Sequence, residues 1–117
     1  MSNLSRGDVV WVSFPAPHQP KGFKRRPGLL LTEPAAAEKL GYAVLVPVSS
    51  RVDLVRPLSI LVAMDSPEGR QMGILTDSRL FVGELGGVSW FAVEGRLGTC
   101  PLLAKIDGVV QELVRGS

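Results

Sequence analysis

The residues best suited to chemistry form one short stretch, Lys24-Arg25-Arg26-Pro27, which leads directly into the apolar run Gly28–Thr32. Proline fixes its own φ and has no N–H to donate, so Pro27 suits the first residue of a strand. It also favours an extended conformation for Arg26. A guanidinium on a rigid element can bind a phosphate through two hydrogen bonds. The stretch therefore predicts an anion site, with a solvated basic turn as the alternative.

Three further residues could take part in the chemistry at such a site. Ser49 follows a buried Val-Pro strand, where its hydroxyl can hydrogen-bond a phosphate or simply serve the turn. His18 lies eight positions before Arg26 and has the ordinary pKa best suited to proton transfer near neutrality. It is a candidate base or a solvated loop histidine. Asp77, at a strand end, is a second candidate base or the cap of a turn.

Other cations and aromatics of the same region can line the path of a polyanion. We expect Phe23 to offer a stacking platform for a base, and the electrostatic grip to weaken steeply with salt. The cations expected around the phosphates are Lys21, Lys24, Arg25 and Arg51. We interpret Trp11, Trp90 and Phe91 instead as residues of the core or of a dimer contact.

The apolar pattern predicts a small, curled, mostly antiparallel sheet that positions these residues. A loop spans Pro15–Arg26, Pro34–Leu40 forms a helical turn, and turns occupy Ser66–Arg70 and Gly83–Gly87. The predicted strands are Gly7–Phe14, Pro27–Thr32, Tyr42–Val48, Leu58–Met64, Gly73–Thr76, Leu80–Val82 and the second half of Trp90–Leu97.

An amphipathic helix is predicted at the carboxy terminus. Thr99 can serve as its N-cap, Pro101 fits its first turn, and Gly116 is its stop. Its apolar stripe comprises Leu102, Leu103, Ile106, Val109, Val110, Leu113 and Val114.

Composition limits the classes of protein that fit. The 117 residues suit one domain, 1–117, and 45% hydrophobic residues indicate a folded chain. The 13 Lys+Arg against 11 Asp+Glu argue against coating nucleic acid by bulk charge, but not against a local basic groove. A single cysteine and a polar amino terminus predict a cytoplasmic protein without membrane segments. One His and one Cys do not suggest a metal site, and no cofactor is expected.

The order of motifs along the chain resembles the MazF/PemK (Kid) family of toxins from bacterial toxin–antitoxin pairs. The resemblance runs from Arg6 to about Val114 and rests on five segments that precede the amphipathic helix. They are Arg6-Gly7-Asp8-Val9-Val10-Trp11-Val12, Arg26-Pro27-Gly28-Leu29-Leu30-Leu31, Val44-Leu45-Val46-Pro47-Val48-Ser49-Ser50 with Ile74-Leu75-Thr76-Asp77, and Glu94-Gly95-Arg96-Leu97-Gly98.

The resemblance implies an SH3-like β-barrel of six to seven short antiparallel strands with a C-terminal helix, working as a homodimer. It implies sequence-selective cleavage of single-stranded RNA without a metal, leaving a 2′,3′-cyclic phosphate and a 5′-hydroxyl. A cognate antitoxin with a flexible, often acidic C-terminal segment would block the RNA groove. Arg26 and Ser49 match the family's catalytic positions, with His18 as a candidate base. The RNA-binding set would be Lys21, Phe23, Lys24, Arg25, Ser50, Arg51, Asp77 and Arg79.

Two departures from the family pattern keep other functions open. Ser49 stands where the family commonly has threonine, and Asp77-Ser78-Arg79 is one residue shorter than the usual segment. The alternatives are a non-catalytic poison of the same fold, as in the CcdB family that acts on gyrase, and a homologue that binds RNA or antitoxin without cleaving. A poison would not need the basic loop with Arg26 and Ser49.

Overall fold

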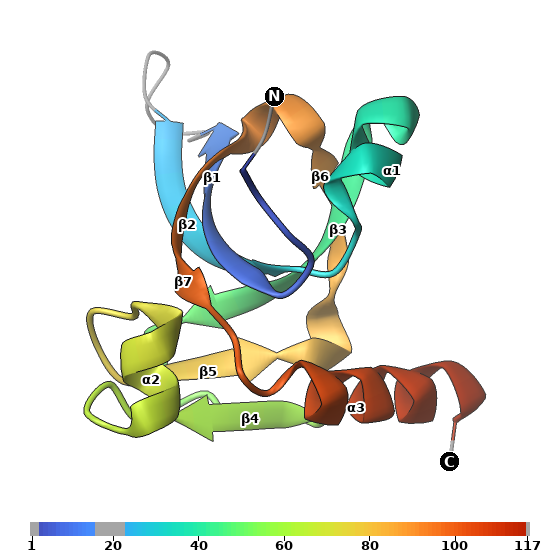
Figure 1. Cartoon of the computed structure of the whole chain (residues 1–117). Helices are drawn as coiled ribbons and strands as arrows, with labels where there is room; N and C mark the ends of the chain where they lie inside the picture. Colours follow the sequence, from blue (N-terminus) through green and yellow to red (C-terminus); the bar gives the residue numbers. More distant parts are fainter. Residues whose placement is uncertain (1–2, 16–22, 117) are drawn as a thin grey trace.

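The computed structural model describes residues 3–15 and 23–116, and of residues 14, 15, 23 and 24 only the backbone. This part of the chain contains seven strands and three α-helices (Figure 1). The strands are β1 (Asp8–Pro15), β2 (Phe23–Leu30), β3 (Tyr42–Ser49), β4 (Ser59–Val62), β5 (Ser78–Phe81), β6 (Gly86–Ser89) and β7 (Val93–Thr99). The α-helices are α1 (Pro34–Leu40), α2 (Pro67–Met72) and α3 (Leu103–Arg115), and single 3₁₀ turns occupy Val82–Glu84 and Trp90–Ala92.

The strands pair antiparallel in the order β4-β5-β3-β2-β1-β7, and β6 pairs with the other end of β3. The sheet curls strongly, as Figure 1 shows. Among the described residues no ladder joins β4 to β7, so hydrogen bonds do not close it into a complete barrel. The prediction of a mostly β fold with short antiparallel strands and a carboxy-terminal helix is confirmed.

The curled sheet buries apolar side chains on both of its faces. Successive residues of a strand point to opposite faces, and β1 follows this rule: Val9 packs in one apolar cluster, whereas Val10 and Val12 pack in another. In β2, Leu29 and Leu30 divide between the same two clusters. These two central strands are therefore fixed in register from both sides, and residues at their open ends are held firmly.

The second strand starts earlier than the sequence predicts. Residues 23–26, expected in a loop, pair with β1, so Pro27 lies inside β2 opposite Trp11 instead of at its start. The β2–β3 ladder ends at the pair Gly28–Pro47. Pro27 and Pro47 have no N–H to donate beyond this point. The two strands therefore part just where Arg26 and Ser49 follow.

The region after β4 also differs from the prediction. Ser66 accepts a hydrogen bond at its Oγ from the N–H of Gly69 (3.0 Å) and caps a helix, α2, where only a turn was expected. The predicted strand Gly73–Thr76 is wrong. Its Ile74 is buried but Leu75 is 78% exposed, and the segment joins no ladder of the described sheet.

The carboxy-terminal helix is confirmed, but Thr99 is not its N-cap. Thr99 ends β7, and its hydroxyl donates to the buried carboxylate of Asp8 (3.2 Å), while α3 begins at Leu103. Ile106 is fully buried, and Gly116 ends the helix in the left-handed conformation, as predicted.

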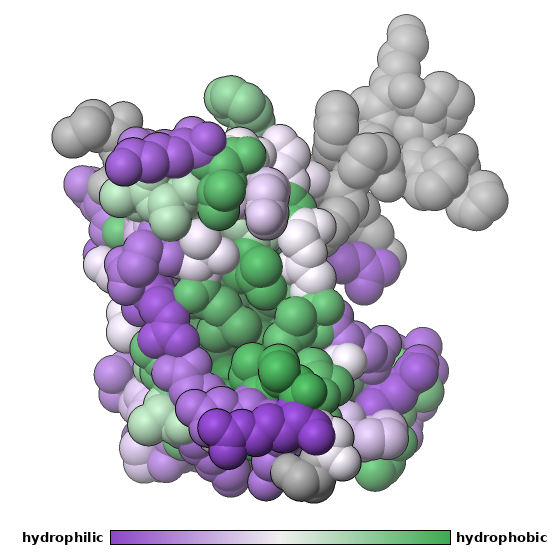
Figure 2. Space-filling view, turned by 90° about the vertical axis from the view of Figure 1, so that its right-hand side faces the viewer, coloured by the Kyte–Doolittle hydropathy of each residue, from purple (hydrophilic) through white to green (hydrophobic). Residues whose placement is uncertain are grey.

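Apolar side chains remain visible on one side of the molecule. Figure 2 shows them gathered in a hollow on the side that carries α1, β6 and the end of α3. The stripe of α3 is only partly used by the core, since Leu113 and Val114 at its end are 39% and 79% exposed. None of the helices in residues 3–15 and 23–116 is long and apolar enough to cross a membrane.

Candidate functional site

Arg26 and Ser49 are brought together by strand register. The β2–β3 pairs Gly28–Pro47, Leu29–Val46 and Leu30–Leu45 are antiparallel, so two residues further out Arg26 and Ser49 fall opposite each other. Because cross-strand partners share a face and side chains alternate with period two, both lie on the face of Gly28 and Pro47. The sequence alone could not supply this pairing, since the pairing depends on the register of two strands that are far apart in the chain.

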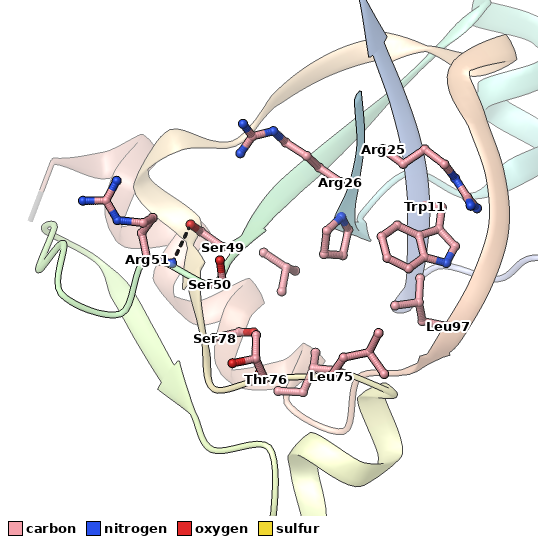
Figure 3. A pocket seen from close by; sticks show the side chains of 13 residues that line it. Trp11, Arg25, Arg26, Ser49, Ser50, Arg51, Leu75, Thr76, Ser78 and Leu97 are labelled. Carbon is pink, nitrogen blue, oxygen red and sulfur yellow. Dashed lines mark hydrogen bonds between the residues drawn. The ribbon is translucent and has the colours of Figure 1, made fainter. Parts of the chain in front are cut away.

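A pocket of about 460 Å³ opens where the two strands part (Figure 3). Its wall includes Arg26 and Ser49 together with residues from β1, β7 and the segment before β5. The lining residues are Trp11, Arg25, Arg26, Pro27, Val48, Ser49, Ser50, Arg51, Ile74, Leu75, Thr76, Ser78 and Leu97.

A second cleft, of about 350 Å³, shares Arg26, Pro27, Val48 and Ser49 with the first. It continues over Gly28 and Pro47 towards the 3₁₀ turn Val82–Glu84 and β6. Arg26 and Ser49 therefore stand on the ridge between two hollows, a position from which both can contact one extended ligand lying across them.

Three arginines line the larger pocket, and they differ in how far their charge is already neutralised. Arg25 forms an ion pair with Glu94, with its Nε 2.8 Å from the carboxylate. Arg51 makes a two-pronged contact with Asp53, at 3.1 Å from Nε and 3.0 Å from Nη2. Arg26 is exposed, and its side chain forms no ion pair or hydrogen bond with any described residue. Arg26 is thus the guanidinium most readily available to an anion.

The strand-end hydroxyl is held in place by the turn that follows it. Ser49 Oγ accepts the backbone N–H of Arg51 at 3.1 Å, drawn as the dashed line in Figure 3. Its O–H proton remains free to be donated, because the backbone contact uses the oxygen as acceptor. The paired Asp53 raises the pKa of Arg51, and its own pKa is lowered, chiefly by the hydrogen bonds from Arg51.

Asp77 and Arg79, two members of the predicted RNA-binding set, do not line this pocket. Asp77 accepts the backbone N–H of Met64 at 2.8 Å, which is a structural cap and not the position of a base. Arg79 pairs directly with Ser49 across the β3–β5 ladder, but its Nε donates to the carbonyl of Val52 at 2.7 Å. Arg79 therefore braces the loop beside Ser49.

Four other predicted residues cannot be placed in the pocket. His18 and Lys21 lie outside the described residues. Phe23 and Lys24 belong to β2, but their side chains are outside the described part. Ser50, Arg51 and Arg25 do line the pocket. Among described residues, no group of three or more His, Cys, Asp or Glu side chains could hold a metal ion.

Sequence reasoning missed one wall of the site. Trp11, interpreted as a core or dimer residue, lies in the pocket wall with Leu75, Thr76 and Leu97. Trp11 reaches the pocket wall because it pairs with Pro27. The sequence predicts Pro27 at the start of the second strand and does not predict this pairing. Phe91, also interpreted as a core or dimer residue, is 92% exposed and so is not part of the core.

Comparison with solved structures gives the same fold throughout the chain. A chain in the crystal structure of MazE-MazF from Deinococcus radiodurans superposes with a TM-score of 0.74 at 22% identity, covering 100% of both chains. An endoribonuclease in complex with its cognate antitoxin from a mycobacterial species gives 0.66 at 16% identity, covering 96% of this chain and 95% of that one. Mycobacterium tuberculosis toxin MazF-mt6 gives 0.60 at 15% identity, covering 93% of each.

By sequence, no protein-family model and no curated protein matches the chain. The likeness to the solved structures therefore establishes the fold: this protein has the architecture of the MazF toxins.

Proposed function

We propose that the protein is a MazF-type toxin, a sequence-selective endoribonuclease that cleaves single-stranded RNA, inhibits growth and is neutralised by a cognate antitoxin. The observation that carries the proposal is the placement of Arg26, whose guanidinium pairs with no described residue, opposite the strand-end hydroxyl of Ser49 on the ridge between two clefts. The fold supports it, since solved chains of the same architecture include an endoribonuclease bound to its antitoxin.

Arg26 can supply the charge stabilisation that RNA cleavage needs. The 2′-hydroxyl loses its proton to a base and its oxygen attacks the adjacent phosphorus as the bond from phosphorus to the 5′-oxygen breaks. The 5′-oxygen takes up a proton, so a 2′,3′-cyclic phosphate and a 5′-hydroxyl remain. Negative charge builds up on the phosphoryl oxygens during this step, and Arg26 offers fixed donors to them. Ser49 would donate a hydrogen bond from its hydroxyl to the same phosphate, or align the 2′-hydroxyl.

Arg26 is a poor proton acceptor because its guanidinium stays charged. His18 remains the proposed base, from the segment that leads to β2. Asp77 is not proposed for this role, since its carboxylate caps the backbone of Met64.

Two partners are proposed, an antitoxin at the same site and a second copy of the chain at another surface. The antitoxin's flexible, often acidic C-terminal segment would compete with RNA for Arg26 and its neighbours. A second copy of the chain would cover the apolar hollow beside α3 seen in Figure 2, giving a homodimer, and light scattering of the purified protein measures this. We propose that the toxin acts in the cytoplasm.

The test is incubation of the purified protein with a long single-stranded RNA in excess EDTA, followed by mapping of the cut ends. The proposal predicts discrete cuts whose 5′ ends a polynucleotide kinase labels without prior phosphatase treatment. Arg26→Ala should lose most of this cleavage. Its matched control is Arg115→Ala, which removes an exposed arginine at the far end of α3 and should still cut. Absence of cleavage together with arrest of DNA supercoiling would replace the proposal by a gyrase poison.

A further inference from the structure

Trp11 lines the pocket and belongs to neither of the two apolar clusters of the core. Trp11 sits directly opposite Pro27 in the β1–β2 ladder, and both residues line the pocket. Its ring is partly exposed and lines the cavity with Leu97 and the 78% exposed Leu75. An indole at the edge of an open pocket offers a flat apolar surface to a planar ligand.

Arg25 adds a second flat group to this surface. Its guanidinium carbon lies 4.9 Å from the centroid of the Trp11 ring, within the range of a cation–π contact. Glu94 from β7 holds it there, with Nε at 2.8 Å from the carboxylate, and the same carboxylate accepts the hydroxyl of Ser13. Figure 3 shows Arg25 turned towards Trp11, whereas Arg26 extends towards the side of the pocket with Ser49 and Arg51.

The ion pair decides which role Arg25 can play. Because Glu94 already neutralises its charge, Arg25 is a weaker competitor for a backbone phosphate than Arg26, which has no ion-pair partner among the described residues. Its planar shape remains, and guanidinium planes stack on rings. This differs from the sequence-based expectation that Arg25 helps to line the phosphate path.

The rest of the pocket suits a base better than a phosphate. Its volume of about 460 Å³ falls in the range of small-molecule sites. Apolar walls from Pro27, Leu75 and Leu97 are joined by the hydroxyls of Thr76 and Ser50. Such hydroxyls can donate to or accept from the edge of a base. The pocket also adjoins the Arg26–Ser49 ridge, within reach of a nucleotide next to the cleaved bond.

We infer that the Trp11 indole and the Arg25 guanidinium together form a stacking site for one nucleobase of a single-stranded nucleic acid, with Glu94 as the residue that positions Arg25. The inference rests on the proposed function in that it assigns a subsite of the same ligand. It predicts that one base contributes about 5- to 150-fold to affinity through stacking.

The experiment uses fluorescence of Trp11 alone. The chain has two tryptophans, so Trp90→Phe leaves Trp11 as the single reporter. The probe is a mixed-sequence 2′-O-methyl RNA, which lacks the attacking hydroxyl and cannot be cut by this route. The control is an abasic oligonucleotide of equal length, which carries the same phosphates without bases. We expect the first to quench Trp11 and the second to leave it unchanged.

Two variants separate stacking from simple attraction. Trp11→Phe with Trp90 retained should show no base-dependent quenching. Arg25→Lys keeps the charge but loses the plane, so affinity should fall several-fold while the slope of log affinity against log salt stays unchanged. Equal quenching by the abasic strand, no quenching by either strand, or an Arg25→Lys protein that binds like the parent would each overturn the inference.

These readouts fail separately from the proposed function. Base-dependent quenching in a protein that never cuts RNA would keep the stacking site and remove the nuclease. RNA cleavage without base-dependent quenching would keep the nuclease and remove the stacking site.

Discussion

Arg26 and Ser49 stand opposite each other by the register of the β2–β3 pair, two residues beyond the last ladder pair, Gly28 and Pro47. Two prolines at this end have no N–H to extend the ladder. The separated strands leave an open ridge that carries, beside a hydroxyl, a guanidinium with no partner among the described residues. The site therefore arises from where the hydrogen bonding ends, and each residue is held by a strand whose other end is buried on both faces.

Removing the Arg26 guanidinium should slow cleavage strongly without affecting folding. Arg26→Ala is expected to lower the cleavage rate by about 10²- to 10³-fold, the loss typical of one charge-stabilising donor. Because Arg26 is exposed and has no partner among the described residues, the thermal midpoint should stay within experimental error of the wild type. Single-turnover kinetics and thermal unfolding measure the two effects. A large drop in the midpoint would mean that Arg26 is structural.

Freeing a second arginine should strengthen RNA binding. Asp53→Asn removes the carboxylate that Arg51 contacts through two nitrogens. Arg51 can then turn to a phosphate, so affinity should rise several-fold at low salt and the salt dependence should steepen by roughly one released counterion. Fluorescence anisotropy over a salt series measures both quantities.

The control for this prediction is Asp65→Asn, which removes an equal charge from another exposed position. It should give a smaller gain and leave the salt slope unchanged, since no arginine contacts Asp65 among the described ion pairs. Equal effects of the two variants would show that only net charge matters.

Two helical glycines should respond to alanine in opposite directions. At Gly69 in α2 an added Cβ would lie 2.1 Å from the carbonyl oxygen of Ala63, a backbone atom that cannot move aside easily. At Gly108 in α3 nothing lies within 4 Å. Gly108→Ala should stabilise by up to about 1 kcal/mol through helix propensity. Gly69→Ala should destabilise by more than about 2 kcal/mol because the backbone must shift.

Urea unfolding of both glycine variants measures these changes. Stabilisation by Gly69→Ala would show that Gly69 does not lie against the carbonyl group of Ala63 as described.

The sequence predicted the fold from signals that are local. The apolar runs of β1, β2 and β3 and the helical stripe of α3 are visible as periodicity, and Gly116 marks the stop of that helix. The motif order added the architecture, which the solved MazF chains share. What local pattern could not supply is which partner a residue finds in space.

Thr99 illustrates the point, because its hydroxyl donates to Asp8, 91 positions away, instead of capping the next helix. Gly73–Thr76 has apolar residues but no strand to pair with, and α2 begins at a proline in a segment that reads as a turn. In the site, Arg26 and Ser49 were recognisable from their motifs. Trp11 was not, since its place in the pocket depends on pairing with Pro27.

The central claim is that Arg26 and Ser49 act on the same phosphodiester, and a double-mutant cycle of cleavage tests it most directly. The values of kcat/KM for wild type, Arg26→Ala, Ser49→Ala and the double variant on one RNA give the coupling between the two side chains. The account predicts strong non-additivity, with the double variant little slower than the worse single variant. Fully additive losses, or a Ser49→Ala protein as active as the wild type, would contradict it.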